Sequence, residues 1–375
     1  MFDVPSLRIG KVFGIPVEVN ASWLVIFGLV AFSLARSYFP SIQEANGAPV
    51  WLMVVVACVT ALLFFLSVLA HELSHSLVVR AEGGNVDRIT LFIFGGVAQM
   101  DDEPRSPGRE FLMAFAGPAM SLLLAGVCFV AFVVTTTAGA PWWIWAPLQY
   151  LAAINLAVGI FNLLPGFPLD GGRVLRSILW AITGDVLKAT RWASASGQLI
   201  GWAMVAWAVL GVLNGRTDLI WFGLIGWFIA SLAGQAYRQQ LLRSRIEGVK
   251  VSRIMTPTPE YVDGQLMLDQ LVQRYFLGAR HSRYPVMNEG AIVGLVTLPD
   301  VKEVARADWP FVRAIEITST NLSELTVAED APVDGLIARL AKDKPGALLV
   351  VGEGRLVGIV TRADVLELIQ GSPGA

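Results

Sequence analysis

Long apolar segments recur through the first 235 residues, and they constrain the fold more than any other feature of the sequence. A helix needs about 20 apolar residues to cross the hydrocarbon core of a bilayer. The segments of this kind are approximately Val17–Ala35, Val50–Val79, Phe111–Thr137, Trp143–Leu164, Ala193–Leu213 and Leu219–Ala233. The composition, with 55% hydrophobic and 15% charged residues, also lies beyond the soluble average. We therefore expect an α-helical polytopic membrane protein with about six transmembrane helices, in which the segment Pro165–Ile182 can also re-enter the membrane.

Basic residues are distributed unequally between the connections of these segments. With the N-terminus inside, thirteen Lys and Arg residues fall in inner segments, whereas Arg36 and Arg216 are the two in outer loops. Because Lys and Arg accumulate on the cytoplasmic side, this bias predicts a multi-pass protein of the cell membrane with both termini in the cytoplasm. The first apolar segment begins late and lacks a small-residue cleavage site, so we expect it to stay as an anchor.

Two of the three histidines of the chain, His71 and His75, stand four residues apart at the end of the second apolar segment. Positions i and i+4 share one face of a helix, so both imidazoles can bind one zinc ion while Glu72 hydrogen-bonds a water in the fourth position. The same pattern also occurs by chance on soluble helices. Here it lies at membrane depth, where each polar group costs a few kcal/mol, and this placement favours a functional metal site.

A third protein ligand is needed, because two histidines and a water leave a tetrahedral zinc ion one ligand short. Asp170 is the best-placed carboxylate, since it lies in a segment, 162–173, where two prolines and three glycines interrupt an apolar stretch. Irregular backbone at membrane depth is tolerated where it is buried in protein or lines a cavity. Asp170 can alternatively cap a short helix that starts near Gly171. Three acidic residues in what looks like a solvated loop compete for the same role: Asp101, Asp102 and Glu103.

The motifs His71-Glu-Leu-Ser-His75 and Asn162-Leu-Leu-Pro-Gly-Phe-Pro-Leu-Asp170-Gly-Gly-Arg together resemble those of the site-2 protease family of intramembrane zinc metalloproteases. The resemblance extends over most of the first 235 residues through three shorter segments: Gly14-Ile-Pro-Val, Phe94-Gly95-Gly96 and Gly117-Pro118. It implies one zinc ion per chain, held by His71, His75 and Asp170, with Glu72 as the catalytic base. It also implies that Asn162 is a polar group near the scissile carbonyl or its oxyanion, although a buried Asn can instead only tie together broken backbone.

The same resemblance implies hydrolysis of peptide bonds within transmembrane segments of single-span substrates, such as anti-sigma factors or membrane-tethered regulators. A helical substrate hides its peptide groups, so cleavage needs a locally extended strand. Residues Val86–Met100 alternate in a way that predicts a hairpin, whose edge could pair with that strand; an ordinary packed hairpin is the alternative. The GxSG and GxGD motifs of serine and aspartyl intramembrane proteases do not occur in the sequence.

After about residue 235 the composition changes to alternating β and α patterns. The segment Ile292–Val301 recurs as Leu356–Val365, and each copy is an apolar strand, a Thr and then an Asp that opens a helix. These copies resemble a tandem pair of CBS domains, an α/β module. The resemblance implies an adenine nucleotide, with ATP or AMP favoured, and the residues that would contact it are Thr297, Asp300, Thr361 and Asp364. The same residue types can instead cap the helices that follow.

We therefore expect a transmembrane zinc metalloprotease domain in residues 1–235, a linker in 236–248 and two CBS domains in 249–308 and 309–370, with a homodimer formed through the CBS domains. Two other functions stay open. One is a CBS-regulated membrane channel or transporter without proteolysis, which would place polar residues along a conduction path. The other is an inactive scaffold, against which the intact Glu72 argues. A net charge of −2 indicates no nucleic-acid partner.

Overall fold

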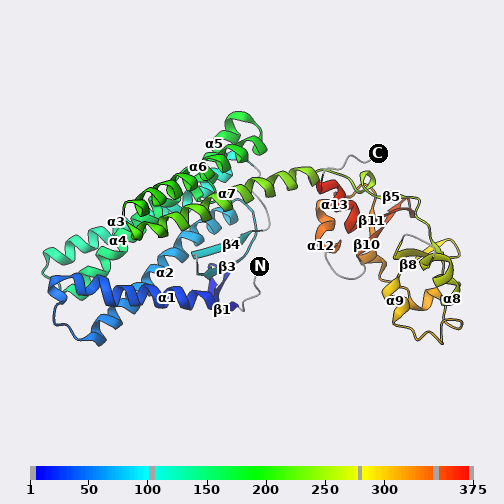
Figure 1. Cartoon of the computed structure of the whole chain (residues 1–375), viewed down its shortest axis with the longest axis horizontal. Coiled ribbons are helices and arrows are strands. Elements are labelled where there is room, and N and C mark those ends of the chain that lie inside the picture. Colours follow the sequence, from blue (N-terminus) through cyan, green and yellow to red (C-terminus); the bar gives the residue numbers. More distant parts are fainter. Residues whose placement is uncertain (1–5, 94, 101–105, 278–280, 341–345, 371–375) are drawn as a thin grey trace. The chain divides into compact units, whose positions relative to one another are not determined.

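The computed structural model describes residues 6–93, 95–100, 106–277, 281–340 and 346–370. The chain divides into two compact units, Met1–Arg238 and Gln239–Ala375. Figure 1 shows that helices dominate the first unit, whereas the second mixes short helices with strands. Each unit has its own hydrophobic clusters, so each is described by itself.

The first unit is a bundle of long helices (Figure 1). Its helices are α1 (Ala21–Ser33), α2 (Val50–Ala81), α3 (Pro107–Thr137), α4 (Trp142–Asn162), α5 (Asp170–Thr183), α6 (Val186–Leu213) and α7 (Ile220–Ile246). Six helical segments in the described residues are long and apolar enough to cross a membrane, and α5 is not among them. The prediction of about six transmembrane helices is therefore confirmed. Large apolar side chains such as Leu123 and Leu199 point out of the bundle, as they do in helices that face lipid.

The prediction was wrong about where three of these helices begin, and one of them, α3, begins at Pro107 rather than at Phe111. Residues 17–20 belong to strand β2 (Ile15–Asn20), and α1 begins only at Ala21. Ile15 and Val17 are buried while Pro16 between them is not, as expected for alternate residues of a strand. The side chain of Asn20 then caps α1 by accepting from the Ser22 amide. The fifth predicted span, Ala193–Leu213, corresponds to α6, which begins earlier than expected because Asp185 caps its N-terminus by accepting from the Lys188 amide.

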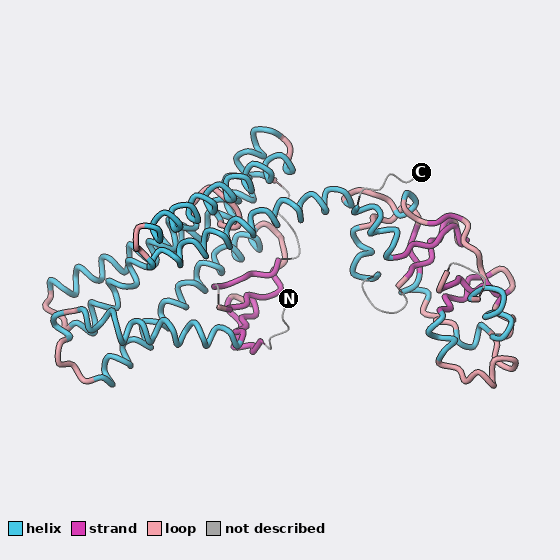
Figure 2. The backbone as a smooth tube through the Cα atoms, in the orientation of Figure 1, coloured by secondary structure: helices cyan, strands magenta, loops and turns pink. Residues whose placement is uncertain are grey.

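A four-stranded sheet of order β1-β2-β3-β4 accompanies the bundle. Its other strands are β1 (Ser6–Val12), β3 (Val86–Phe92) and β4 (Gly95–Met100). Strands β3 and β4 form the predicted antiparallel hairpin, and β2 joins it in parallel through β3. Both β3 and β4 contact α2, the helix that carries His71 and His75, and Figure 2 shows the sheet beside that helix. Strand β4 lies at one edge of this sheet.

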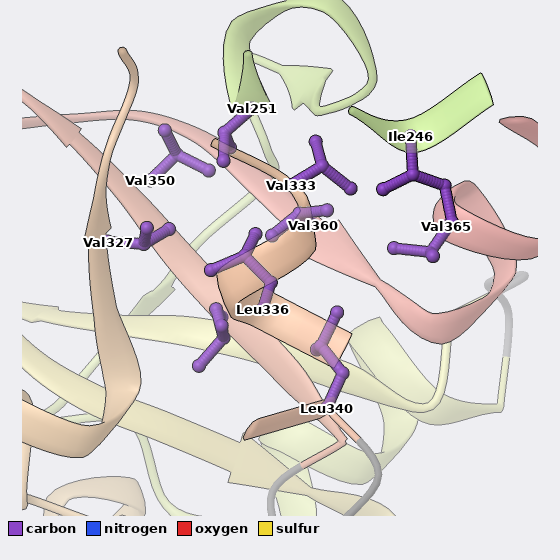
Figure 3. Packing of buried hydrophobic residues seen from close by; sticks show 10 residues of the cluster. Ile246, Val251, Val327, Val333, Leu336, Leu340, Val350, Val360 and Val365 are labelled. Carbon is purple, nitrogen blue, oxygen red and sulfur yellow. The ribbon is translucent and has the colours of Figure 1, made fainter. Parts of the chain in front are cut away.

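The second unit contains two sheets, of order β5-β11-β10-β9 and β6-β7-β8. Its strands are β5 (Thr256–Pro257), β6 (Val262–Asp263), β7 (Arg283–Asn288), β8 (Ala291–Thr297), β9 (Thr326–Ala328), β10 (Ala347–Gly352) and β11 (Arg355–Thr361). Its helices are α8 (Leu268–Leu271), α9 (Leu298–Lys302), α10 (Ala314–Ile317), α11 (Leu322–Leu325), α12 (Ile337–Leu340) and α13 (Arg362–Gln370). Figure 3 shows the core beside the β5-β11-β10-β9 sheet, where Val350 and Val360 belong to one buried cluster with Leu336.

The internal repeat of the sequence is visible in the pairing of these strands. The hairpin of β7 and β8 pairs Arg283 with Thr297, and the hairpin of β10 and β11 pairs Ala347 with Thr361 at the same relative positions. Each hairpin shifts register once, at the equivalent place along its first strand. Helix α7 continues to Ile246, so it covers most of the segment 236–248 that the sequence suggested as a linker.

Candidate metal centre

Three side chains converge at the predicted metal site. His71 and His75 are buried on α2, and Asp170 is the first residue of α5. The two Nε2 atoms are 3.2 Å apart, and the Asp170 Oδ2 atom lies 3.1 Å from Nε2 of His71 and 3.3 Å from Nε2 of His75. Two ligand atoms about 2.1 Å from a tetrahedral zinc ion are separated by roughly 3.4 Å. The three atoms therefore form a triangle of nearly the size that one zinc ion requires.

The hydrogen bonds on the far side of each imidazole fix which nitrogen faces this triangle as a ligand. Nδ1 of His75 lies 2.6 Å from the backbone carbonyl oxygen of Met113, which can only accept, so Nδ1 carries the proton and Nε2 presents its lone pair. Nδ1 of His71 lies 2.9 Å from the Ser121 hydroxyl, which can accept in the same way. When the Ser121 hydroxyl accepts, two lone pairs and a carboxylate oxygen face one another, and a cation between them stabilises that arrangement. The donor set fits zinc, which binds neutral imidazole and carboxylate.

Helix α3 supports both histidines along one face. Met113, Gly117 and Ser121 are successive buried positions on that face, one helical turn apart. A Cβ atom on Gly117 would come within 2.2 Å of Nε2 of His75 and 2.5 Å of Nε2 of His71. Glycine at this position thus lets the backbone of α3 lie directly against the two imidazoles.

Glu72 follows the first histidine on α2 and lies beside β4. A Cβ atom on Gly96 would be 2.4 Å from Cγ of Glu72, so the backbone of β4 passes in direct contact with this side chain. This contact brings the predicted catalytic carboxylate and the edge strand together. The part of the resemblance that falls on Phe94 lies outside the described residues.

Asp170 is held in place by backbone packing at the start of α5. Cβ atoms on Gly171 and Gly172 would come within 2.4 Å of backbone atoms of Leu163 and Gly166, and one on Gly197 of α6 would come within 2.0 Å of the Phe167 carbonyl oxygen. The segment 163–167 is therefore wedged between α5 and α6. The alternative of Asp170 as a helix cap does not describe what is found, because Leu169 occupies the cap position and the carboxylate faces the histidines.

The other candidates for this site differ in their placement. Asp101, Asp102 and Glu103 lie outside the described residues. Asn162 is the half-buried last residue of α4, and its role near the scissile carbonyl stays a prediction. Sequence reasoning missed Ser121 and the Met113 carbonyl. The only signal for Ser121 was a hydroxyl in an apolar helix, one turn after Gly117-Pro118.

The four predicted nucleotide-binding residues form two matched pairs in the second unit. Oδ2 of Asp300 accepts from the Thr297 amide at 2.9 Å and from its hydroxyl at 2.6 Å, and this pair is buried. Oδ2 of Asp364 accepts from the Thr361 amide at 2.6 Å and from its hydroxyl at 2.8 Å, and this pair is half-buried. Both pairs thus cap the helices that follow, which was the alternative interpretation.

Comparison with known proteins bears directly on this site. The model of peptidase family M50 matches residues 59–142 and 137–206, and the CBS domain model matches residues 251–307 and 314–371. The chain is 36% identical to a candidate zinc metalloprotease of Synechocystis sp. over 98% of this chain and 96% of that protein. The chain belongs to peptidase family M50.

Two further proteins are similar to this chain over much of their own length. Rip3 of Mycobacterium tuberculosis, named as a candidate zinc metalloprotease, is 34% identical over 97% of this chain and 93% of its own. A solved site-2 protease from Methanocaldococcus jannaschii is 29% identical, covers 62% of this chain and 95% of its own, and has a TM-score of 0.41. By its family models and the relatives that it matches over almost its whole length, the chain is a multi-pass membrane zinc metalloprotease of family M50 with a pair of CBS domains. This membership sets aside the channel and transporter alternative.

Proposed function

We propose that this M50 protein hydrolyses peptide bonds within the transmembrane segments of membrane-anchored, single-span substrates. The observation that supports this most is the triangle of His71, His75 and Asp170, two members of which lie on a helix long and apolar enough to span a membrane. A metal site in that position can reach bonds that soluble proteases cannot. Anti-sigma factors and membrane-tethered regulators are substrates of the right architecture.

The chemistry follows from the residues around the triangle. Zinc, when bound by these three residues, supplies a Lewis acid for the peptide carbonyl and makes its water a stronger acid. Glu72 accepts the proton of the attacking water and delivers it to the leaving amine. Ser121 and the Met113 carbonyl hold the imidazoles so that Nε2 of each keeps its lone pair toward the metal. Asn162 is proposed to donate to the carbonyl oxygen of the bond that is cut.

The substrate is proposed to reach Glu72 as an extended strand along β4. Strand β4 is an edge of the sheet, so its outer backbone groups can pair with a further strand. Its contact at Gly96 places that edge against the catalytic carboxylate. Addition of a strand would unwind the substrate helix at the site of cleavage and expose its peptide groups.

The charge bias and the C-terminal unit support proposals about the location of the enzyme, its oligomeric state and its ligands. The bias of Lys and Arg supports a cell-membrane location with both termini in the cytoplasm. The CBS pair is proposed to mediate a homodimer and to bind ATP or AMP. Of the two Thr–Asp pairs, the half-buried pair of Thr361 and Asp364 is the more accessible, so it is the better candidate for binding the ribose hydroxyls.

Co-expression with candidate single-span substrates tests the proposal. Mass spectrometry of the products should locate the cut within the transmembrane segment for the wild type and find no product for Glu72→Gln. Glu82→Gln is the matched control, because Glu82 lies at the C-terminal end of the same helix in a partly exposed ion pair with Arg109. This variant should cleave substrate at the wild-type rate. Cuts confined to extramembrane loops, or cleavage by Glu72→Gln at the wild-type rate, would refute it.

A further inference from the structure

A buried ion pair joins α3 to α5 close to the metal centre. Glu110 is 0% exposed and Arg176 is 7% exposed, and Nε of Arg176 donates to Oε1 of Glu110 at 2.6 Å while Nη2 contacts the same oxygen. Arg109, the residue before Glu110, is instead half exposed, and its Nε atom lies 4.0 Å from Oε2 of Glu82. Burial removes both charges of the Glu110 pair from water, and such a pair is seldom more stabilising than apolar side chains of similar size. Its geometry is therefore the more informative property.

Arg176 makes a second contact with the broken segment that leads into α5. Its guanidinium carbon lies 5.3 Å from the centroid of the Phe167 ring. Phe167 is itself buried, and its amide donates to the Ala193 carbonyl of α6 at 3.2 Å. The planar guanidinium thus contacts a carboxylate on α3 and a ring on the segment before Asp170 at the same time, which a lysine could not do.

Both residues lie on elements that carry parts of the metal centre. Glu110 belongs to the same buried face of α3 as Met113, Gly117 and Ser121. That face holds the two histidines through Ser121 and the Met113 carbonyl. Arg176 lies on α5, six residues after Asp170. One face of α3 is therefore tied to all three ligands, to the histidines directly and to the aspartate through Glu110 and Arg176.

We propose that Glu110 and Arg176 are positioning residues that hold α5 so that the Asp170 carboxylate completes the metal triangle. The close packing of Gly171 and Gly172 fixes the start of α5 against segment 163–167, and the ion pair fixes the helix one and a half turns further on against α3. Two attachment points determine the direction of a short helix, whereas a single attachment point leaves the helix free to tilt. The inference rests on the proposed zinc site.

The double variant Glu110→Leu with Arg176→Met tests this role, because it replaces the pair by apolar side chains and leaves no unpaired buried charge. Three quantities are measured on detergent-solubilised full-length protein: the thermal unfolding temperature without metal, the zinc dissociation constant by chelator competition, and the visible spectrum with Co²⁺. We expect a folded protein that binds zinc about 10–100-fold more weakly, with a weaker tetrahedral Co²⁺ spectrum. Unchanged zinc affinity and Co²⁺ spectrum in a folded double variant would overturn the proposal.

Two single variants complete the experiment. Arg176→Lys keeps the charge and loses the planar contact with Phe167, so zinc binding should weaken by about 10-fold. This variant keeps the proposal testable if the double variant does not fold. An unchanged zinc affinity in Arg176→Lys contradicts the proposal. Arg109→Gln removes an exposed charge next to Glu110 and should bind zinc like the wild type. Wild-type protein that binds no zinc refutes the metal site itself, whereas equal binding by wild type and Arg176→Lys refutes only the positioning role.

Discussion

The metal centre and the two pairs Thr297–Asp300 and Thr361–Asp364, called Thr–Asp boxes here, each contain an Asp carboxylate, yet the bonding of that carboxylate is different. At the metal centre, Nδ1 of His71 and of His75 are satisfied by α3, while both Nε2 atoms and the Asp170 carboxylate turn toward one point. In the boxes, each Asp carboxylate accepts from the amide and the hydroxyl of a Thr three residues before it. The first arrangement suits a cation at the point where the three atoms meet, whereas in the second the hydrogen bonds are made within the helix cap itself.

This difference indicates which polar motifs need a ligand. Acceptor atoms that converge from separate elements repel one another unless a proton or a bound cation lies between them. A carboxylate that already accepts two local hydrogen bonds explains its own presence. Large functional effects are therefore expected at the metal centre and smaller ones at the boxes.

The largest effect is expected for Glu72→Gln. The amide keeps the size of the side chain but cannot take the proton of the attacking water, and a positioned base is worth about 10²–10⁴ in rate. Cleavage of a single-span substrate in detergent should fall by at least this factor, while zinc content stays at the wild-type level. Near wild-type cleavage would show that the base is a different residue.

Gly117→Ala should displace the metal ligands, because the added Cβ atom has no room beside Nε2 of His71 and His75. We expect loss of zinc together with activity, measured by elemental analysis of the purified protein. Gly126→Ala is the matched control on the same helix, since a Cβ atom there meets nothing within 4 Å. Full zinc occupancy in Gly117→Ala would mean that α3 does not lie against the ligands as described.

Ser121→Ala should have an intermediate effect. It removes the partner of Nδ1 of His71, and loss of such a partner typically weakens metal binding by about 10–100-fold. Chelator competition measures the change, and Thr136→Ala is the control, because among the described residues that hydroxyl donates to backbone carbonyls of the preceding turn. An unchanged dissociation constant would remove Ser121 from the support of the metal.

The smallest effects are expected at the boxes. Asp300→Ala and Asp364→Ala each remove a helix cap and should lower the free energy of unfolding by about 0.5–2 kcal/mol. If the pair also binds nucleotide, calorimetry with ATP or AMP on the full chain should show a greater loss for Asp364→Ala than for Asp300→Ala, since Asp300 is the more buried. Absence of binding at millimolar nucleotide to the wild type would leave the boxes as caps alone.

Much of the fold, and the convergence of His71, His75 and Asp170, could be predicted because the signals are local. Apolar length predicted the spans, spacing on a helix predicted His71 and His75, and the broken segment predicted Asp170. The first and fifth helices were misplaced at their starts, because the strand ending at Asn20 and the cap at Asp185 depend on contacts that hydropathy does not report.

The support of the site could not be predicted, because it depends on which helices become neighbours. Ser121 is 50 residues from His71, and Glu110 is 66 residues from Arg176. Each is one of several polar residues in its helix, and nothing in the sequence pairs it with its partner. Gly117 and Gly96 were noticed as parts of motifs, but their function as points of close approach is evident only from the packing.

Zinc per chain, measured in wild type and Asp170→Ala, tests the central claim most directly. The account predicts one zinc ion per wild-type chain and a large loss in Asp170→Ala, because two imidazoles alone hold the metal weakly. Asp101→Ala and Asp102→Ala serve as controls and should keep full zinc. A wild type without zinc, or full occupancy in Asp170→Ala, would contradict the account.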